Sequence, residues 1–323
     1  MIQPEIVSIG EMLIDFTASM DSDGEIIYRR NAGGAPANVA VMAAKLGVPS
    51  AFIGKVGKDM FGKYLKNVLT DNGVNTDGLI LDNKYCTTLA FVGKDENGDR
   101  DFVFYRKDGA DTQLTYKEVR LKLIDNCKIV HFGSLMLTNE PSRSAALLAV
   151  EYAKQQGKII SYDPNWRENL WESKAEAINA MQSVLKMVDI IKVSENELQI
   201  VTDCGNMIPA IAKLFNAGIK IVCITQGAKG CIIATKQGIE RFSTYKVETV
   251  DTLGAGDSFF GAFLSCIVRS GKPLDEISMS ELREYAMYAN ACGSLSSTKA
   301  GAIPAMPTDE EIKELCKNGT VIQ

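Results

Sequence analysis

The chain contains a single histidine, His131, among its 323 residues. Its eight cysteines include no pair spaced as Cys-x-x-Cys. Zinc sites in proteins are built mainly from these two residue types, so the sequence excludes an ordinary zinc site. Histidine is also the commonest general base in enzymes. Because it is so scarce here, any acid–base chemistry is expected to use a carboxylate.

The sequence also lacks an excess of positive charge and a long hydrophobic run. The 35 lysines and arginines against 40 acidic residues give a formal net charge of −5. This excludes a broad basic surface for nucleic acid or anionic lipid, but not a local pocket for a small anion. No apolar run approaches the roughly 20 residues that span a bilayer. The first residues, MIQPEIVSIGEM, lack the basic flank of a secretory signal. We therefore expect neither a nucleic-acid nor a membrane partner.

Several cysteines lie inside apolar runs, as Cys223 does in IKIVCIT and Cys266 in FFGAFLSCIV. Cysteine in such a setting packs as a small hydrophobic residue. Thiols persist in the reduced state in the cytoplasm, so we expect a cytoplasmic location.

Three motifs of common nucleotide and hydrolase sites are missing. The sequence has no G-x-x-x-x-G-K-[ST], which excludes a P-loop, and no G-x-S-x-G elbow, which argues against an α/β-hydrolase. No G-x-G-x-x-G follows the first expected strand, so a dinucleotide-binding oxidoreductase has little support.

Short apolar runs rich in β-branched residues alternate with longer helical patterns, which predicts an α/β fold with a mostly parallel sheet covered on both faces. The expected strands are Glu5–Ile9, Ser50–Val56, Lys128–Phe132, Lys158–Tyr162, Asp189–Val193 and Lys220–Thr225. The expected helices are Ala35–Leu46, Met60–Asn72, Pro141–Gln156, Lys174–Met187 and Met207–Asn216.

Two segments interrupt this alternation. Residues 15–30 contain a D-S-D-G turn, and residues 88–105 read as two apolar strands joined by a D-E-N-G-D turn. We expect strands from about 12–31 and 86–106 to form a small sheet that acts as a lid at the carboxyl edge of the main sheet, where open α/β folds bind ligands. The sequence shows no repeat or long linker, so residues 1–323 are predicted to form one domain.

The strongest chemical motif is D-T-L-G-A-G-D-S-F-F-G at 251–261. Gly254, Ala255 and Gly256 precede a helical pattern, and the free amides at a helix start attract phosphate. A phosphate would repel the carboxylate of Asp257 unless that group has a task, and taking a proton from an attacking hydroxyl is one. The alternative is a helix cap beside an ordinary turn. The two flanking aspartates and the helix start favour the functional interpretation.

Two further motifs carry polar groups near expected element ends. In N-A-G-G-A-P-A-N-V-A at 31–40, Asn38 lies in a small-residue helix, where its amide points to a polyol hydroxyl or to a local hydrogen bond. In S-Y-D-P-N-W-R at 161–167, Asp163, Asn165 and Arg167 alternate directly after a strand. Strand ends of this kind usually form the sites of α/β proteins, although a solvated loop is the alternative.

Two other segments follow strands. K-V-S-E-N-E at 192–197 offers Glu197 to orient a Mg²⁺-bound water. It also matches a capping box between Ser194 and Glu197, and both interpretations can hold together. T-Q-G-A-K-G at 225–230 is similar to a turn at the edge of a nucleotide, but a simple hairpin turn is equally consistent with it.

These residues together carry a family resemblance. G-G-A-P-A-N-V-A at 33–40 and D-T-L-G-A-G-D-S-F at 251–259 resemble the two signatures of the ribokinase-like (PfkB) carbohydrate kinases, and the resemblance runs over essentially the whole chain. Within that family, several segments are most similar to fructokinases. They are GEMLIDF at 10–16, FYR at 104–106, GAD at 109–111, DPNWR at 163–167, KVSxxE at 192–197, and NACGS…KAGAIPAMP at 290–307.

The resemblance implies a three-layer α/β/α sandwich, a small lid sheet and a role for each matching position. Asp257 would be the catalytic base, with an anion hole at Gly254, Ala255 and Gly256. The sugar would contact Asp15, Gly33, Gly34, Asn38, Tyr105, Arg106, Asp163 and Arg167. ATP would lie near Lys192, Ser194, Glu197, Thr225, Gly227, Gly230 and Asn290. A monovalent cation, K⁺, would bind at Asp251, Leu253, Ala300 and Gly301.

One position departs from the pattern, because many relatives have N-x-x-E where this chain has Ser194 to Glu197. Glu197 is therefore expected to contact Mg²⁺ through water.

The implied reaction is MgATP-dependent phosphorylation of D-fructose by a homodimer that pairs through its lids. The alternatives are 2-keto-3-deoxygluconate kinase or another PfkB sugar or nucleoside kinase, because Arg106 and Arg167 could clamp a sugar-acid carboxylate. A non-catalytic regulator that binds sugar or nucleotide is a third possibility.

Overall fold

The fold is built on two β-sheets of different size. The computed structural model describes residues 3–94 and 100–322. The larger, nine-stranded sheet has the order β13-β12-β11-β10-β9-β8-β1-β4-β5. Its strands are β1 (Ile6–Ile9), β4 (Ser50–Gly57), β5 (Asn75–Asp82), β8 (Ile129–Gly133), β9 (Ile159–Asp163), β10 (Ile190–Ser194), β11 (Ile221–Thr225), β12 (Cys231–Thr235) and β13 (Gly238–Phe242). All neighbours are parallel except β11–β12 and β12–β13, which confirms the expected mostly parallel sheet.

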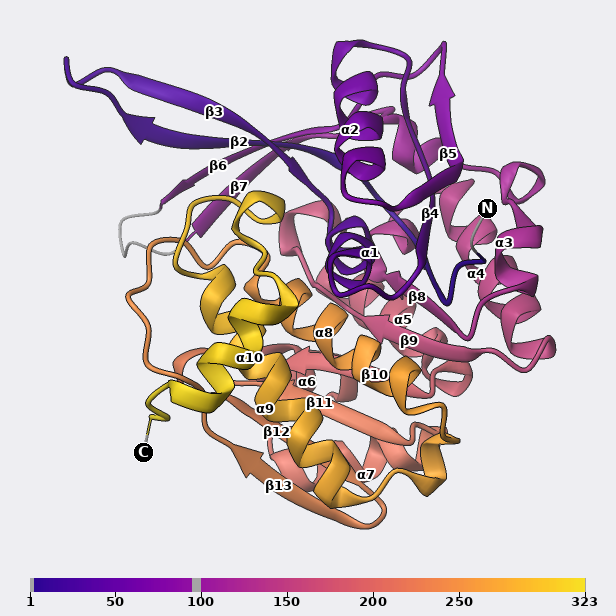
Figure 1. Cartoon of the computed structure of the whole chain (residues 1–323). Coiled ribbons are helices and arrows are strands. Elements are labelled where there is room, and N and C mark those ends of the chain that lie inside the picture. The colour runs from indigo at the N-terminus through magenta and orange to yellow at the C-terminus, as the bar shows by residue number, and fades with distance from the viewer. Residues whose placement is uncertain (1–2, 95–99, 323) are drawn as a thin grey trace.

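Helices cover both faces of this sheet (Figure 1). They are α1 (Ala35–Lys45), α2 (Met60–Asp71), α3 (Leu121–Asp125), α4 (Ser142–Gln155), α5 (Lys174–Ser183), α6 (Glu195–Thr202), α7 (Met207–Ala217), α8 (Ala255–Ser270), α9 (Met279–Ser296) and α10 (Asp309–Asn318). Helices α1, α2, α8, α9 and α10 contribute to one hydrophobic core, and α3 to α7 contribute to the other. Along β1 and β4, neighbouring residues point into opposite cores: Ile6 and Phe52 into the first, Val7 and Ile53 into the second.

The smaller sheet has the order β3-β2-β6-β7. Its strands are β2 (Leu13–Met20), β3 (Ile26–Gly33), β6 (Leu89–Lys94) and β7 (Arg100–Tyr105). The predicted turn between β2 and β3 forms where the Asp21 carboxylate accepts from the amides of Asp23 and Glu25. Strands β6 and β7 pair as an antiparallel hairpin, as expected. Its expected D-E-N-G-D turn, 95–99, lies outside the described residues. Figure 1 shows the small sheet projecting from the body beside α2.

The expected helix over Lys174–Met187 is too long. Helix α5 ends at Ser183, and a separate 3₁₀ turn follows at Leu185–Met187. The side chains of Val184 and Leu185 are both buried in the second core. The regular α-helix therefore ends before these two residues, and the tighter turn that follows keeps both of them in the core.

In the described part of the chain, no helix combines the length and the apolar character that crossing a membrane requires.

Candidate active site

Helix α8 begins at the carboxyl edge of the sheet, after a loop that exposes its backbone. Gly254 has a φ of 72°, in the left-handed region that suits glycine. A Cβ atom there would lie 2.5 Å from Cβ of Ala302, so the packing also requires glycine. The 16 residues of α8 direct the positive end of their dipole toward this loop. Three backbone amides, those of Gly254, Ala255 and Gly256, were predicted to bind an anion. The amide of Ala255 already donates a hydrogen bond to the Thr252 carbonyl at 3.2 Å in this structure.

A cavity of about 170 Å³ opens at this helix start. Nine of the predicted site residues line it: Asp15, Gly34, Asn38, Arg167, Lys192, Leu253, Gly254, Gly256 and Asp257. The small sheet also contributes side chains to its wall, including Phe102 and Phe104. The cavity is therefore shared between the two sheets and the first turn of α8.

Asp257 lines this cavity and is held by Asn38, 219 residues away in the chain, whose Nδ2 donates to Oδ2 at 2.8 Å. Burial raises the pKa of Asp257 above its ordinary value, and Lys192, the Asn38 hydrogen bond and Arg167 limit the rise. A carboxylate with a raised pKa is a stronger base than an exposed aspartate, which suits proton abstraction.

Lys192 and Asp163 form a buried ion pair beside Asp257. Nζ lies 2.6 Å from Oδ2 of Asp163, and the side chains are 8% and 1% exposed. Burial raises the pKa of Asp163 to about 6 despite the opposing effect of the ammonium group. Burial alone would lower the pKa of Lys192, but Asp163, Glu197 and Asp257 raise it. The pair is therefore charged at neutral pH.

The same ammonium group lies against the start of α8. A Cβ atom at Gly256 would lie 3.1 Å from Nζ of Lys192. A side chain at this position would separate the ammonium group from the helix backbone. The arrangement therefore fits a phosphoryl group, which would have a fixed positive charge on one side and a helix N-terminus on the other.

A second cavity, of about 480 Å³, lies on the other side of the α8 start. It is lined by four residues predicted to surround ATP, namely Thr225, Gly227, Gly230 and Asn290. Thr252 and Gly256 line both this cavity and the smaller one. The two cavities thus meet at the first turn of α8.

Ser194 and Glu197 line neither cavity. The Glu197 carboxylate accepts from the backbone amide of Ser194 at 2.8 Å, and the Ser194 hydroxyl accepts from that of Glu197 at 3.2 Å. This is the expected capping box at the start of α6. The other oxygen of Glu197 accepts from the Trp166 amide at 2.9 Å. Both carboxylate oxygens of Glu197 therefore accept a backbone hydrogen bond.

Asp251 joins the two loops that were predicted to hold a monovalent cation. Its oxygens accept from the amides of Leu253 at 3.1 Å and Gly301 at 2.8 Å. Leu253, Ala300 and Gly301 are therefore brought together. Among the described residues, no group of three or more His, Cys, Asp or Glu side chains comes close enough to hold a metal ion.

Four predicted sugar contacts lie outside the lining of the smaller cavity. Tyr105 is 65% exposed, and its ring packs against Phe91. Arg106 is buried, and donates to Asp111, Thr138 and the Leu135 carbonyl. The backbone of Gly33 lies against the carboxylate of Asp15, which does line the cavity. Asp163, a fourth, acts on the cavity through Lys192.

Asn165, which the sequence analysis noted beside Asp163 and Arg167, also lines the cavity. Sequence reasoning missed other lining residues, namely Glu11, Leu13, Ala35, Phe102, Phe104, Leu135 and Thr252. For two of these residues, Phe102 and Phe104, the alternation of side chains along β7 offers a partial signal. Phe102 and Phe104 share one face of the strand, and Val103 and Tyr105 share the other. Nothing in the local sequence says which face turns toward the cavity, so the alternation alone could not choose between the two pairs.

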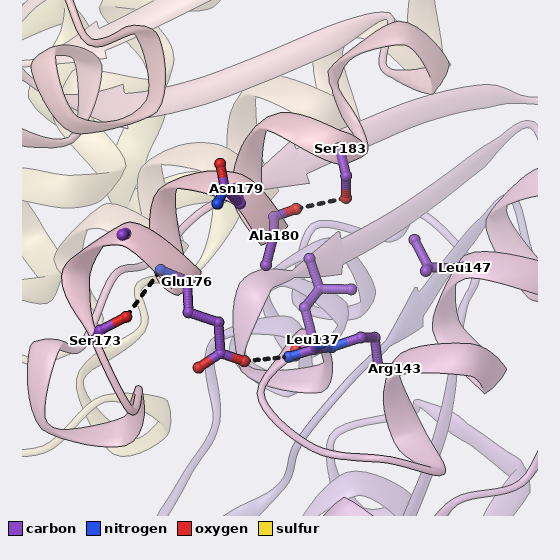
Figure 2. A pocket seen from close by; sticks show the side chains of 9 residues that line it. Leu137, Arg143, Leu147, Ser173, Glu176, Asn179, Ala180 and Ser183 are labelled. Atoms are coloured by element: carbon purple, nitrogen blue, oxygen red, sulfur yellow. Dashed lines mark hydrogen bonds and ion pairs between the residues drawn. The ribbon is translucent and has the colours of Figure 1, made fainter.

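A further depression of about 520 Å³ lies between α4 and α5, away from these residues (Figure 2). Its charged side chains, Arg143 and Glu176, pair with each other at 2.7 Å. It contains none of the predicted site residues. We therefore place the candidate active site at the two cavities that meet at α8.

Comparison with known proteins agrees with this geometry. Residues 3–309 match the family described as pfkB family carbohydrate kinase, and the chain belongs to this family. It is 42% identical to fructokinase-1 from Oryza sativa subsp. japonica over 317 residues, which cover 97% of this chain and 98% of the relative.

Two solved structures extend the likeness. A fructokinase from Xylella fastidiosa with bound ATP has a TM-score of 0.88 at 28% identity, with coverage of 97% of this chain and 98% of that one. A fructokinase from Vibrio cholerae O395 with fructose, ADP and calcium has a TM-score of 0.86 at 32% identity, with coverage of 96% and 98%. These matches confirm the expected ribokinase-like fold and family.

The buried ion pair yields a stability prediction. Replacing Lys192 with methionine leaves the Asp163 carboxylate buried without its cation, and we expect the free energy of unfolding in urea to fall by about 3–5 kcal/mol. The double variant Lys192→Met/Asp163→Asn removes both charges and should recover part of that loss. Lys128→Met, which breaks an exposed pair with Glu5, should cost no more than about 1 kcal/mol. Equal losses in the single and double variants would contradict the role of the pair.

Proposed function

We propose that the chain is an ATP-dependent fructokinase, which transfers the γ-phosphoryl group of ATP to D-fructose and releases fructose 6-phosphate and ADP. The observation that carries this proposal is the meeting of two cavities at Thr252 and Gly256, with Asp257 on the wall of the smaller one. A hydroxylated substrate and a nucleotide could therefore approach the same helix N-terminus from opposite sides. The names of the relatives supply the particular sugar.

In the proposed reaction, Asp257 accepts the proton of the attacking sugar hydroxyl. That oxygen forms a bond to the γ-phosphorus as the bond from phosphorus to the β,γ-bridging oxygen breaks, and ADP leaves with the electron pair. The start of α8 and the ammonium group of Lys192 stabilise negative charge on the transferring group. Asn38 holds the Asp257 carboxylate in place through its 2.8 Å hydrogen bond.

We propose Mg²⁺ and K⁺ as the accompanying cations. Mg²⁺ neutralises charge on the nucleotide phosphates, and it commonly keeps several water ligands. Glu197 fits a water-mediated contact, because both of its oxygens already accept backbone hydrogen bonds. K⁺ is assigned to the loops that Asp251 joins, with Leu253, Ala300 and Gly301 as the surrounding residues.

The charges in the smaller cavity support a neutral sugar over a sugar acid. Glu11, Asp15 and Asp257 all line it, and carboxylates would repel an acidic substrate. Arg167 and Lys192 also line it, and Lys192 is paired with Asp163. Arg106 is committed to Asp111 at 2.7 Å and does not line the cavity. The alternative of a 2-keto-3-deoxygluconate kinase required Arg106 and Arg167 to bind the substrate carboxylate together. Only Arg167 lines the cavity, so this pair is not assembled.

Replacing Asp257 with asparagine tests the proposed base. We expect kcat to fall by at least about 10²-fold, with fructose affinity nearly unchanged, because the amide keeps the shape but cannot accept the proton. In the unmodified protein, kcat/KM should fall on acidification at a pH above the ordinary aspartate value of 3.8, because burial raises the pKa of this group. Steady-state kinetics measure both effects. Near-normal turnover in Asp257→Asn would refute the assignment.

A coupled ADP-release assay tests the substrate. Fructose, ribose, 2-keto-3-deoxygluconate and a nucleoside are compared at equal concentration, with and without K⁺. We expect fructose to have the highest kcat/KM, and K⁺ to raise the rate. Preference for another sugar would replace fructose in this proposal but keep the kinase. No ADP release with any of them would favour a non-catalytic binding protein.

We further propose that residues 1–323 act as one kinase domain and that the small sheet is its lid. The face of the lid opposite Phe102 and Phe104 is apolar: Phe91 packs there against Phe16, Tyr28 and Tyr105. On this face Tyr28 is 50% exposed and Tyr105 65%. Such a patch is typical of a protein interface, which supports pairing of two lids in a homodimer. The eight free cysteines fit the reducing cytoplasm as the location.

Sedimentation velocity at micromolar concentration tests the homodimer. We expect the unmodified chain to sediment as a dimer and Val103→Asp to sediment as a monomer, because Val103 is 51% exposed on the apolar lid face and a carboxylate would be buried by pairing. Ile208→Asp places the same charge on α7, at a residue 62% exposed, and should remain dimeric. A monomer in the unmodified chain would contradict the proposal.

A further inference from the structure

Glu11 has an unusual position for a carboxylate that the proposed reaction does not use. It lies between β1 and β2, where the chain leaves the large sheet for the small one. Its residue surface is only 1% exposed, yet it lines the smaller cavity together with Asp15, Asn38 and Asp257. It is therefore enclosed by protein and adjacent to the space assigned to the sugar.

Only half of this carboxylate is satisfied by the protein. Oε1 accepts from the amide of Ala35, at the first turn of α1, at 3.0 Å. Oε2 is buried and has no hydrogen-bond partner among the described residues. Buried polar atoms are nearly always paired, and one left without a partner is costly. Because Glu11 itself lines the cavity, a ligand bound there is the available source of a donor for this oxygen.

The nearest positive charge does not supply the missing partner. Arg106 lowers the pKa of Glu11, but burial dominates and raises it to about 7, with Asp111 adding to the rise. The Arg106 guanidinium directs its hydrogen bonds to Asp111, Thr138 and the Leu135 carbonyl. Glu11 is thus held near a positive charge without being neutralised by a direct contact.

We propose that Glu11 is a specificity-determining residue whose Oε2 atom forms a hydrogen bond with a non-reacting hydroxyl group of the sugar. The inference rests on the proposed function, since it takes the smaller cavity as the sugar site. The ligand that carries this hydroxyl group is a neutral polyhydroxylated sugar. A site built to bind a hydroxyl group rejects an analogue that lacks it, because the protein group is then left buried and unpaired.

The competing explanation is that Glu11 only anchors α1 through Ala35. Two variants separate the explanations. Glu11→Gln retains an oxygen for the Ala35 amide and replaces the other oxygen with a donor NH₂ group. Glu11→Ala removes both contacts. A purely structural role predicts that the glutamine variant behaves as the unmodified protein and that the alanine variant affects all substrates alike.

The test measures kcat/KM for fructose and for a set of monodeoxy fructoses, each lacking one hydroxyl other than the one that is phosphorylated. We expect both variants to lower kcat/KM for fructose by at least about tenfold, the scale of a hydrogen bond to a charged group. For one deoxy analogue, Glu11→Ala should lower kcat/KM by a clearly smaller factor than it does for fructose, because the partner hydroxyl is already gone and only the loss of the Ala35 contact remains. A decrease by one common factor across every analogue, or a glutamine variant with unmodified kinetics, would overturn the proposal.

Asp59→Asn is the matched control. Asp59 caps α2 by accepting from the amides of Phe61 and Gly62 and from Thr87, and it lines neither cavity. This variant should lower the melting temperature without changing the ranking of the analogues. Kinetics of the unmodified protein separate failure of the proposed substrate from failure of the Glu11 proposal. If the unmodified protein prefers another sugar, the deoxy series of that sugar tests Glu11 in the same way. If it phosphorylates none, the proposed function and this inference both fall.

Discussion

The buried contact between Lys192 and Asp163 is the interaction on which the site depends. It joins the ends of two neighbouring parallel strands, β10 and β9, and places an ammonium group against the backbone of Gly256. A charge buried this deeply requires its partner, and the pair remains ionised at neutral pH because three carboxylates surround the lysine. The result is a fixed positive charge at the start of α8, on the boundary between the two cavities.

The two-sheet architecture explains why polar groups accumulate at this one edge. Five parallel strands end there, namely β1, β8, β9, β10 and β11. The segments that follow β1, β8, β9 and β11 line one of the two cavities, and the segment after β10 forms the capping box of α6. The small sheet contributes Asp15 and two aromatic rings, Phe102 and Phe104, to the wall of the smaller cavity. Burial then acts on each acidic group in the same direction, raising the pKa values of Glu11, Asp163 and Asp257. Enclosure by the fold thus makes these carboxylates more basic than exposed ones.

Much of the fold follows from local pattern. Five of the six predicted strands begin one residue after the predicted start, because a polar residue such as Lys128 or Asp189 precedes the apolar run. Predicted helices α1, α2, α4 and α7 agree with the structure within one residue at each end, whereas α5 starts as predicted but ends four residues early. The bounds of β5, β12, β13, α9 and α10 were not predicted. Of these three strands only β13 alternates apolar and polar residues, whereas β12 is a continuous buried apolar run, and a run this short does not by itself distinguish a strand from a piece of buried helix.

The sequence by itself determined the local features: the glycine-rich helix start at 254–257, the capping box at 194–197, and the turns that separate strands. These are local, because a helix start or a tight turn depends on the few residues within it. Tertiary structure alone decided that Asn38 holds Asp257, that Arg106 is committed to Asp111, that Phe102 rather than Tyr105 lines the cavity, and that Glu11 is buried at the wall of that cavity. Each of these depends on strand register or on the packing of distant segments, and a side chain's partner across such distances is set by the geometry of the layers rather than by its neighbours in sequence.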